Sequence, residues 1–323
     1  MNKTVENLLS LLQSLVFPFS QPSVYRLDDW HERITLITQL SLLLQAKASE
    51  FALGFSTPYN RHSVISLSDV HEEVLKFTDF EISSVQRTAM LDYQPLLDYV
   101  KVDKTNVANE EVVNLFRGVV SVEKLAISTC ALAIIKYTLP IPVVVELANI
   151  IRDECLHLLS LSRLIGIDPL EGGWITSKRN LAWQQLLKCS SALEHVMLEH
   201  CLFEGEGSFS ASYTIYLANK LNFPNPALQV VKRIADEENR HATCGYFIAN
   251  ILATGDSYRM DWARKAIVLL REIEPLDTSD VVKFHKQTIA ERMLNDFATT
   301  GDWVNAIKQV TFYATQAERG IIG

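Results

Sequence analysis

The sequence predicts an all-α fold. We expect a four-helix bundle at residues 107–253, a helical flank at residues 1–106, and C-terminal helices packed on the bundle at residues 254–323. Apolar residues recur at helical spacing along most of the chain, whereas the alternation typical of strands is scarce. The 323 residues are 48% hydrophobic, which is enough for a large core and too apolar for a disordered chain. Loop-forming stretches divide the central helices into two pairs.

The breaks between the predicted helices are defined by proline, glycine and asparagine. Pro140 and Pro142 separate two helices closely, and residues 222–226 (Asn-Phe-Pro-Asn-Pro) form an equally tight turn between two others. The longest connection, residues 166–180, lies between these hairpins. Two hairpins joined by a crossover have the connectivity of a ferritin-like four-helix bundle. The predicted helices cover residues 28–52, 69–100, 110–138, 143–165, 181–221 and 227–253, followed by several shorter ones.

Composition indicates a cytoplasmic protein that binds neither nucleic acid nor membranes. The net charge is −8, from 30 Lys and Arg against 38 Asp and Glu, so the clustered positive charge that phosphate binding requires is not expected. The five cysteines form no CxxC pair and indicate reduced, buried thiols. The apolar stretch at residues 8–19 lacks a small-residue cleavage site, so it predicts an amphipathic helix. Lys136 and two prolines interrupt the apolar stretch at residues 131–151 and argue against a membrane span.

The chain contains two Glu-x-x-His motifs, and each falls on the second helix of a predicted hairpin. The first comprises Glu154 and His157, and the second comprises Glu238 and His241. Because residues three apart share one face of a helix, each motif directs a carboxylate and an imidazole toward the same point. The repetition of the motif in both hairpins predicts that the two pairs act together.

Each hairpin also has a candidate glutamate on its first helix. Glu123 lies in an apolar stripe that includes Val120 and Ile127, so its carboxylate is expected in the core, where it needs a partner. Glu204 occupies the corresponding place in the third helix, although Glu199 on the same helix is an alternative. The separations from the motifs are similar, 154 − 123 = 31 and 238 − 204 = 34, and would place the paired groups at the same height.

Four glutamates and two histidines form the ligand set of a carboxylate-bridged dinuclear metal centre. Two divalent ions bring a charge of +4 and the four carboxylates bring −4, so the buried cluster would be neutral. Oxygen and imidazole ligands without thiolate favour iron or manganese over zinc or copper. The predicted metal ligands are Glu123, Glu154, His157, Glu204, Glu238 and His241.

Neighbouring residues are predicted to support these ligands. Asp153 is expected to hydrogen-bond His241, and Glu237 to hydrogen-bond His157, because such carboxylates fix the orientation of metal-bound imidazoles. His200, one turn before Glu204, is either a seventh ligand, a supporting group or a hydrogen-bonded core residue. Small residues on the metal-facing sides are predicted to leave room for a gas or substrate: Gly207, Ser208, Ala242 and Gly245.

The motifs resemble those of the ferritin-like superfamily. The similarity covers residues 107–253 and is nearest to the uncharacterised ferritin-like proteins known as DUF455, with tRNA hydroxylases and arylamine N-oxygenases as neighbours. The resemblance implies a non-haem di-iron centre that activates dioxygen. Arylamine N-oxygenases carry an additional histidine ligand where this chain has Ile234, which weakens the case for N-oxygenation. The segments that carry the resemblance are Ser121–Ile127, Arg152–His157, Phe203–Gly207 and Asp236–His241.

We therefore expect an oxygen-dependent oxidase or monooxygenase with two iron ions, or a manganese–iron pair, and O2 as cosubstrate. No catalytic residue is expected beyond the metal ligands. The substrate would be a small or carrier-bound metabolite that undergoes C-hydroxylation, N-oxygenation, or oxidative desaturation or cleavage. An external electron donor would be needed, because no flavin or nicotinamide fingerprint is present, and the chain could form a homodimer. The alternatives are a ferroxidase or iron-storage protein and, less favoured, a metal-free scaffold.

Overall fold

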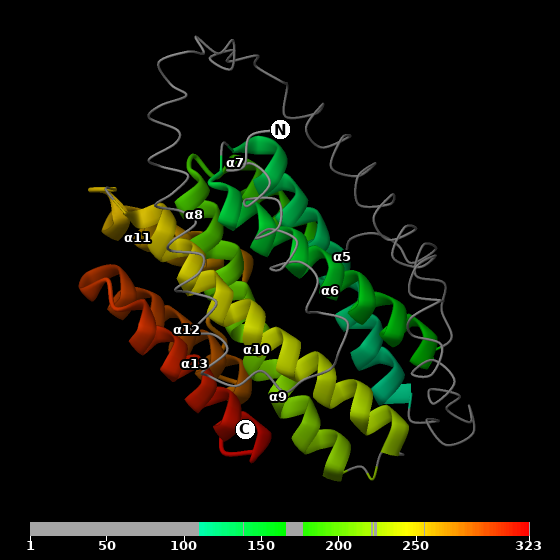
Figure 1. Ribbon diagram of the computed structural model, residues 1–323. Coiled ribbons are helices and arrows are strands. Elements are labelled where there is room, and N and C mark those ends of the chain that lie inside the picture. Colours follow the sequence, from blue (N-terminus) through cyan, green and yellow to red (C-terminus); the bar gives the residue numbers. More distant parts are fainter. Residues whose placement is uncertain are drawn as a thin grey trace, which may run out of the picture. The chain divides into compact units, whose positions relative to one another are not determined.

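The computed structural model describes residues 110–137, 139–165, 177–220, 222, 225–254 and 256–322, and all regular structure in these ranges is helical (Figure 1). The helices predicted at residues 28–52 and 69–100 lie outside the described residues. The described elements are α5 (Glu110–Lys136), α6 (Ile141–Ile165), α7 (Ser177–Lys188), α8 (Ala192–Val196), the π-helix η3 (Met197–Phe203), α9 (Glu204–Lys220), α10 (Asn225–Ala253), α11 (Arg259–Ile273), α12 (Val281–Thr300) and α13 (Trp303–Glu318).

Two helix pairs form the centre of the structure. Helix α5 packs along α6, and α9 packs along α10, while α6 also contacts α10 (Figure 1). Only residues 137–140 separate the first pair and residues 221–224 the second, so the members of each pair are antiparallel. A buried hydrogen bond of 2.6 Å from Thr129 to Glu199 connects α5 to η3. The central helices therefore surround one shared interior.

Prolines occupy the first turn of the second helix in each pair. Pro142 is the second residue of α6 and Pro226 the second residue of α10. A missing backbone N–H is tolerated there, because the first N–H groups of a helix have no intrahelical acceptor. The first and last residues of the helices predicted at 110–138, 143–165 and 227–253 consequently lie within two residues of those observed.

The single helix predicted at residues 181–221 is wrong, because the chain breaks between α7 and α8. The Ser191 side chain accepts a hydrogen bond of 3.0 Å from the Glu194 backbone N–H, while the Glu194 carboxylate accepts one of 2.7 Å from the Ser190 N–H. This reciprocal capping satisfies N–H groups at the start of α8 and stabilises a new helix start. Lys136 Nζ donates to the Cys189 carbonyl at 2.7 Å and ties the break to the end of α5.

A π-helical segment follows directly after α8. Its geometry ends where the Glu204 backbone N–H donates to the carbonyl of Glu199, five residues earlier. The wider turn places residues five apart on a similar face. Helix α10 approaches η3 closely at Gly245, where a Cβ atom would lie 2.4 Å from the His200 carbonyl oxygen. Glycine is therefore required for this contact.

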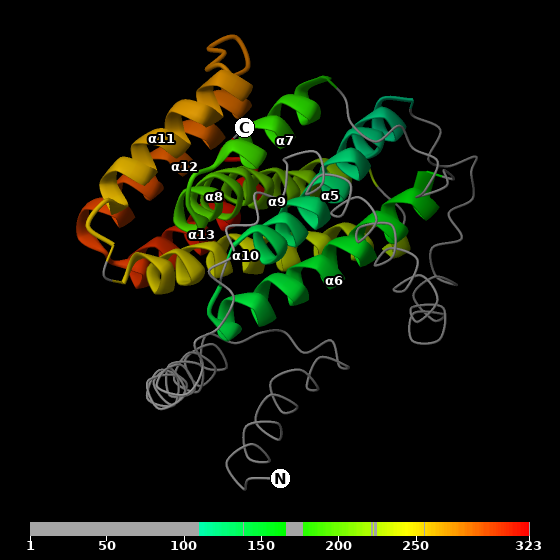
Figure 2. The same cartoon turned by 90° about the horizontal axis from the view of Figure 1, so that it is seen from above.

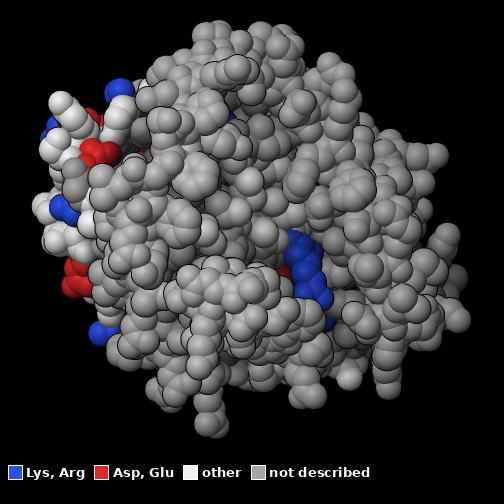
Figure 3. Space-filling view, turned by 45° about the horizontal axis from the view of Figure 1, so that its top comes forward, with Lys and Arg blue, Asp and Glu red and all other residues white. Residues whose placement is uncertain are grey.

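Helices α11, α12 and α13 cover the outer side of α8, η3, α9 and α10, on the side away from α5 and α6 (Figure 2). Leu270, Leu294 and Val310 are fully buried there, and the Tyr246 and Phe297 rings pack edge to face at 5.6 Å. The described surface visible in Figure 3 carries acidic and basic groups side by side. None of the described helices is both long and apolar enough to cross a bilayer.

Candidate metal centre

All six predicted ligands converge in the interior between the central helices. Each is buried, and their potential ligand atoms form two groups in which all atoms lie within 4.8 Å of one another. Helix α5 provides one glutamate, α9 another, and α6 and α10 a Glu-x-x-His motif each. We call the two sets the His157 group, comprising Glu123, Glu154, His157 and Glu238, and the His241 group, comprising Glu154, Glu204, Glu238 and His241.

The two groups share Glu154 and Glu238. Each group contains three carboxylates and one imidazole, and each has one glutamate that the other lacks: Glu123 in the His157 group and Glu204 in the His241 group. Two cations held by these groups would therefore share two bridging carboxylates. The sequence predicted the six residues but not which of them the two groups share, because that depends on the height of each residue across the helices.

The buried polar atoms of the cluster fit a metal site. Both carboxylate oxygens of Glu154, Nδ1 of His157 and Nδ1 of His241 are buried and have no hydrogen-bond partner. They nevertheless lie close together: His241 Nδ1 is 2.8 Å from Glu154 Oε1, and His157 Nδ1 is 3.3 Å from Glu154 Oε2. Burying polar atoms that do not form aligned hydrogen bonds costs free energy. Cations bound between these oxygens and nitrogens would satisfy their lone pairs.

Crowding of the carboxylates perturbs their protonation in the metal-free chain. Burial, together with the charges of Glu154 and Glu238, holds the pKa values of Glu123 and Glu204 well above the usual range. Burial alone would also raise the pKa of Glu154, but the imidazoles of His241 and His157 outweigh it and place that pKa well below the usual range. Metal binding must therefore displace protons from part of the cluster.

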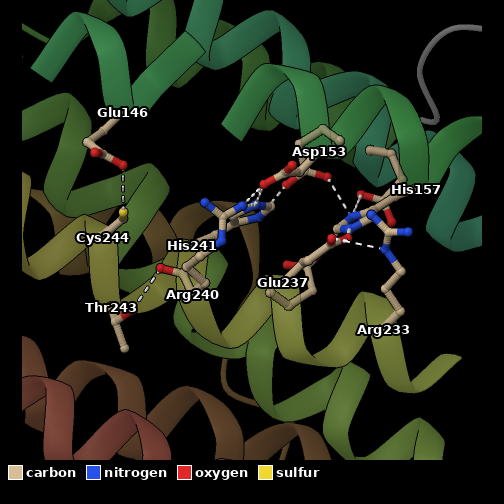
Figure 4. A network of polar contacts seen from close by, with 12 residues as sticks. Glu146, Asp153, His157, Arg233, Glu237, Arg240, His241, Thr243 and Cys244 are labelled. Carbon is tan, nitrogen blue, oxygen red and sulfur yellow. Dashed lines mark hydrogen bonds and ion pairs between the residues drawn. The ribbon is translucent and has the colours of Figure 1, made fainter. Parts of the chain in front are cut away.

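Each histidine is held from behind by a carboxylate, as the sequence predicted. Nε2 of His157 lies 2.8 Å from Glu237 Oε2, and Nε2 of His241 lies 3.3 Å from Asp153 Oδ2 (Figure 4). Because a carboxylate accepts, Nε2–H is the donor in each of these contacts, and Nδ1 of each ring faces the cluster, where its lone pair would be available to a metal. Both predicted pairings are confirmed.

Two arginines complete these contacts, and the sequence reasoning missed them. Arg233 Nε donates to Glu237 Oε1 at 3.0 Å, and Arg240 forms an ion pair with Asp153 (Figure 4). The first pair was detectable, because residues four apart on a helix are neighbours. The second joins α10 to α6 and depends on how those helices pack. On the side away from the cluster, each imidazole thus contacts a carboxylate, and that carboxylate contacts a guanidinium.

Asp153→Ala should lower metal affinity on the order of 10- to 100-fold, because His241 would lose the acceptor that orients its ring. Isothermal titration of the metal-free protein with Mn(II) measures this loss. Asp153→Asn keeps an oxygen acceptor and should lose less. If Asp153→Ala binds metal as the wild type does, the proposed role of this contact is wrong.

Two residues that the sequence left open lie beside the cluster and outside both ligand groups. Glu199 accepts the hydrogen bond from Thr129 and sits one π-turn before Glu204. His200 is fully buried, with Nε2 3.9 Å from the Cys130 sulfur. Burial and the neighbouring His241 lower the pKa of His200 to about 3, so its ring is neutral. The preference for Glu204 over Glu199 agrees with the ligand groups.

The small residues predicted to leave room around the cluster have different roles. A Cβ atom at Gly207 would lie 3.4 Å from Glu238 Oε2 and 3.9 Å from Glu204 Oε2, so both carboxylates are already at van der Waals distance from this position, and the room expected there stays a prediction. Ser208 hydrogen-bonds Asn239. The expectation for Gly245 is wrong, because the backbone of His200 fills the space beside it.

Comparison of the chain with protein-family models, with curated proteins and with solved structures finds no match.

Proposed function

We propose that the central helices form a ferritin-like four-helix bundle around a carboxylate-bridged di-iron centre, and that the protein is an O2-dependent oxidase or monooxygenase. The observation that carries this proposal is the pair of buried ligand groups sharing Glu154 and Glu238. Four carboxylates and two imidazoles at this spacing are the ligand set of di-iron and di-manganese carboxylate proteins.

The donor atoms support iron or manganese as the resident metal. Both groups consist of carboxylate oxygens and imidazole nitrogens, without a thiolate, and this set is less suited to copper. The four carboxylates neutralise two divalent ions, so the filled cluster would carry no net charge into the core. When bound, a pair of irons supplies the redox chemistry that activates dioxygen.

The protein residues would hold, orient and shield this centre. Glu154 and Glu238 connect the two halves, while Glu123 and Glu204 each serve one side. Burial of every ligand excludes bulk water. The substrate would be a small or carrier-bound metabolite, and the electrons would come from an external donor.

Ferroxidase or iron-storage activity is the alternative, and the covering helices favour the enzyme. A storage subunit must pass its iron onward to a mineral, whereas an oxygenase reuses the same pair of ions. Helices α11, α12 and α13 cover the outer side of η3, α9 and α10, which favours retention of the metals.

Iron uptake distinguishes these functions. Protein loaded anaerobically with Fe(II) should bind about two irons per chain. On exposure to air with excess Fe(II), the absorbance should change once and stop, with the iron content still about two per chain. Stopped-flow absorbance and elemental analysis follow both steps. Continued uptake of tens of irons, with a growing mineral-like absorbance, would contradict the oxygenase proposal and support storage.

A further inference from the structure

We propose that the two halves of the centre are not equivalent: the first divalent ion binds in the His157 group, and the second binds more weakly in the His241 group. This inference rests on the proposed metal centre. It concerns which half is filled first, and it follows from the way the carboxylates behind the two histidines are shared with Arg233 and Arg240.

The two supporting carboxylates use their oxygens differently. Glu237 offers Oε2 to His157 at 2.8 Å and its other oxygen, Oε1, to Arg233 at 3.0 Å. Asp153 instead uses the same oxygen, Oδ2, for both His241, at 3.3 Å, and Arg240 (Figure 4). The guanidinium competes with the imidazole for one acceptor. His157 therefore receives the stronger hydrogen bond, which makes its Nδ1 the better metal ligand.

The positive charge of Arg240 also disfavours a cation in the His241 group. Its side chain is only 6% exposed, and Nη2 lies 3.4 Å from Nε2 of His241. Repulsion between buried charges is poorly screened. The Arg233 side chain is 34% exposed and bonds the Glu237 oxygen that does not contact His157, so solvent screens its charge more effectively.

Each ligand group contains three carboxylates, but they lie at different distances from the imidazole: all three in the His157 group lie within 3.9 Å of its Nδ1. His157 Nδ1 lies 3.2 Å from Glu238, 3.3 Å from Glu154 and 3.9 Å from Glu123. The ion-pair contact of His241 Nδ1 is with Glu154, at 2.8 Å. The carboxylates of the His157 group thus surround its imidazole more closely than those of the His241 group do, and all three differences favour the same half. Since supporting contacts of this kind change metal affinity about 10- to 100-fold, the two affinities should differ by about tenfold or more.

The test is an anaerobic titration of the metal-free, full-length protein with Mn(II), using the electron paramagnetic resonance signal of free Mn(II) to count bound ions. Wild type should bind two ions in two steps. Glu204→Gln should keep the tight step and lose the weak one. Glu123→Gln should lose the tight step. Glu199→Gln, a buried neighbour outside both ligand groups, is the matched control and should keep both.

A second pair of variants tests the cause. Arg240→Gln removes the competing cation and should bring the weak step closer to the tight one, whereas Arg233→Gln should not tighten the weak step. Two steps of equal affinity in wild type, or retention of the tight step by Glu123→Gln, would overturn the inference and leave the metal centre in place. Failure of wild type to bind any Mn(II) would contradict the proposed centre itself.

Discussion

Glu154→Ala should remove both metal ions, with an affinity loss on the order of 100-fold or more at each. Glu154 belongs to both ligand groups, and its two oxygens face the two histidines separately, at 2.8 Å and 3.3 Å. One substitution therefore damages both halves. Elemental analysis after anaerobic Fe(II) loading should give close to no retained iron, whereas Glu123→Ala should retain about one ion per chain.

Glu146→Ala is the matched control for this experiment. Glu146 is also a buried glutamate of α6, but it lies outside both ligand groups and contacts Cys244 instead. Its iron content should be close to that of wild type. If Glu154→Ala retains one ion, as Glu123→Ala is expected to do, then Glu154 does not bridge and the assignment of the two groups is wrong.

Glu204→Gln should stabilise the metal-free protein while weakening metal binding. The metal-free cluster confines four carboxylates, and burial and like charges raise the pKa of Glu204 well above the usual range. In the unfolded chain this pKa returns to about 4.3. The unfolded state therefore loses the proton first, so this group makes folding less favourable as pH rises from about 4 toward the folded-state pKa.

The neutral amide introduced by Glu204→Gln would remove this penalty. In chelator at pH 7, the free energy of unfolding should increase by about 1–3 kcal/mol, and the gain should shrink as pH approaches 4. Urea unfolding at both pH values measures it. Glu199→Gln should give no comparable gain, because Glu199 already accepts a hydrogen bond from Thr129. With metal present the wild type should instead have the larger free energy of unfolding, because it binds the metal more tightly than Glu204→Gln and is therefore stabilised more. A metal-free Glu204→Gln variant less stable than wild type at pH 7 would contradict this electrostatic account.

The convergence of the six residues was predictable because their signals are local. A Glu-x-x-His spacing fixes two side chains on one helix face, and Glu123 stands out as a charge in an apolar stripe. The helix pairs followed from prolines that cannot lie in helix interiors. These features depend on neighbours in sequence, and they account for α5, α6, α10 and the six converging residues.

The remaining features depend on packing between distant segments. Sequence periodicity did not reveal η3, because one residue of extra winding leaves the apolar pattern almost unchanged. The break before α8 was marked by Ser191 and Glu194, whose spacing is that of a capping box, but this signal was overlooked. The contact of Arg240 with Asp153 joins α10 to α6, and the sharing of Glu154 between two groups depends on the register of all the central helices.

Anomalous scattering at the iron absorption edge, from crystals of the Fe-loaded protein, would locate the bound metal ions directly. We expect two iron peaks per chain in the interior between the central helices, one in the His157 group and one in the His241 group, with Glu154 and Glu238 contacting both. A single peak, no peak, or iron bound away from these six residues would contradict this expectation.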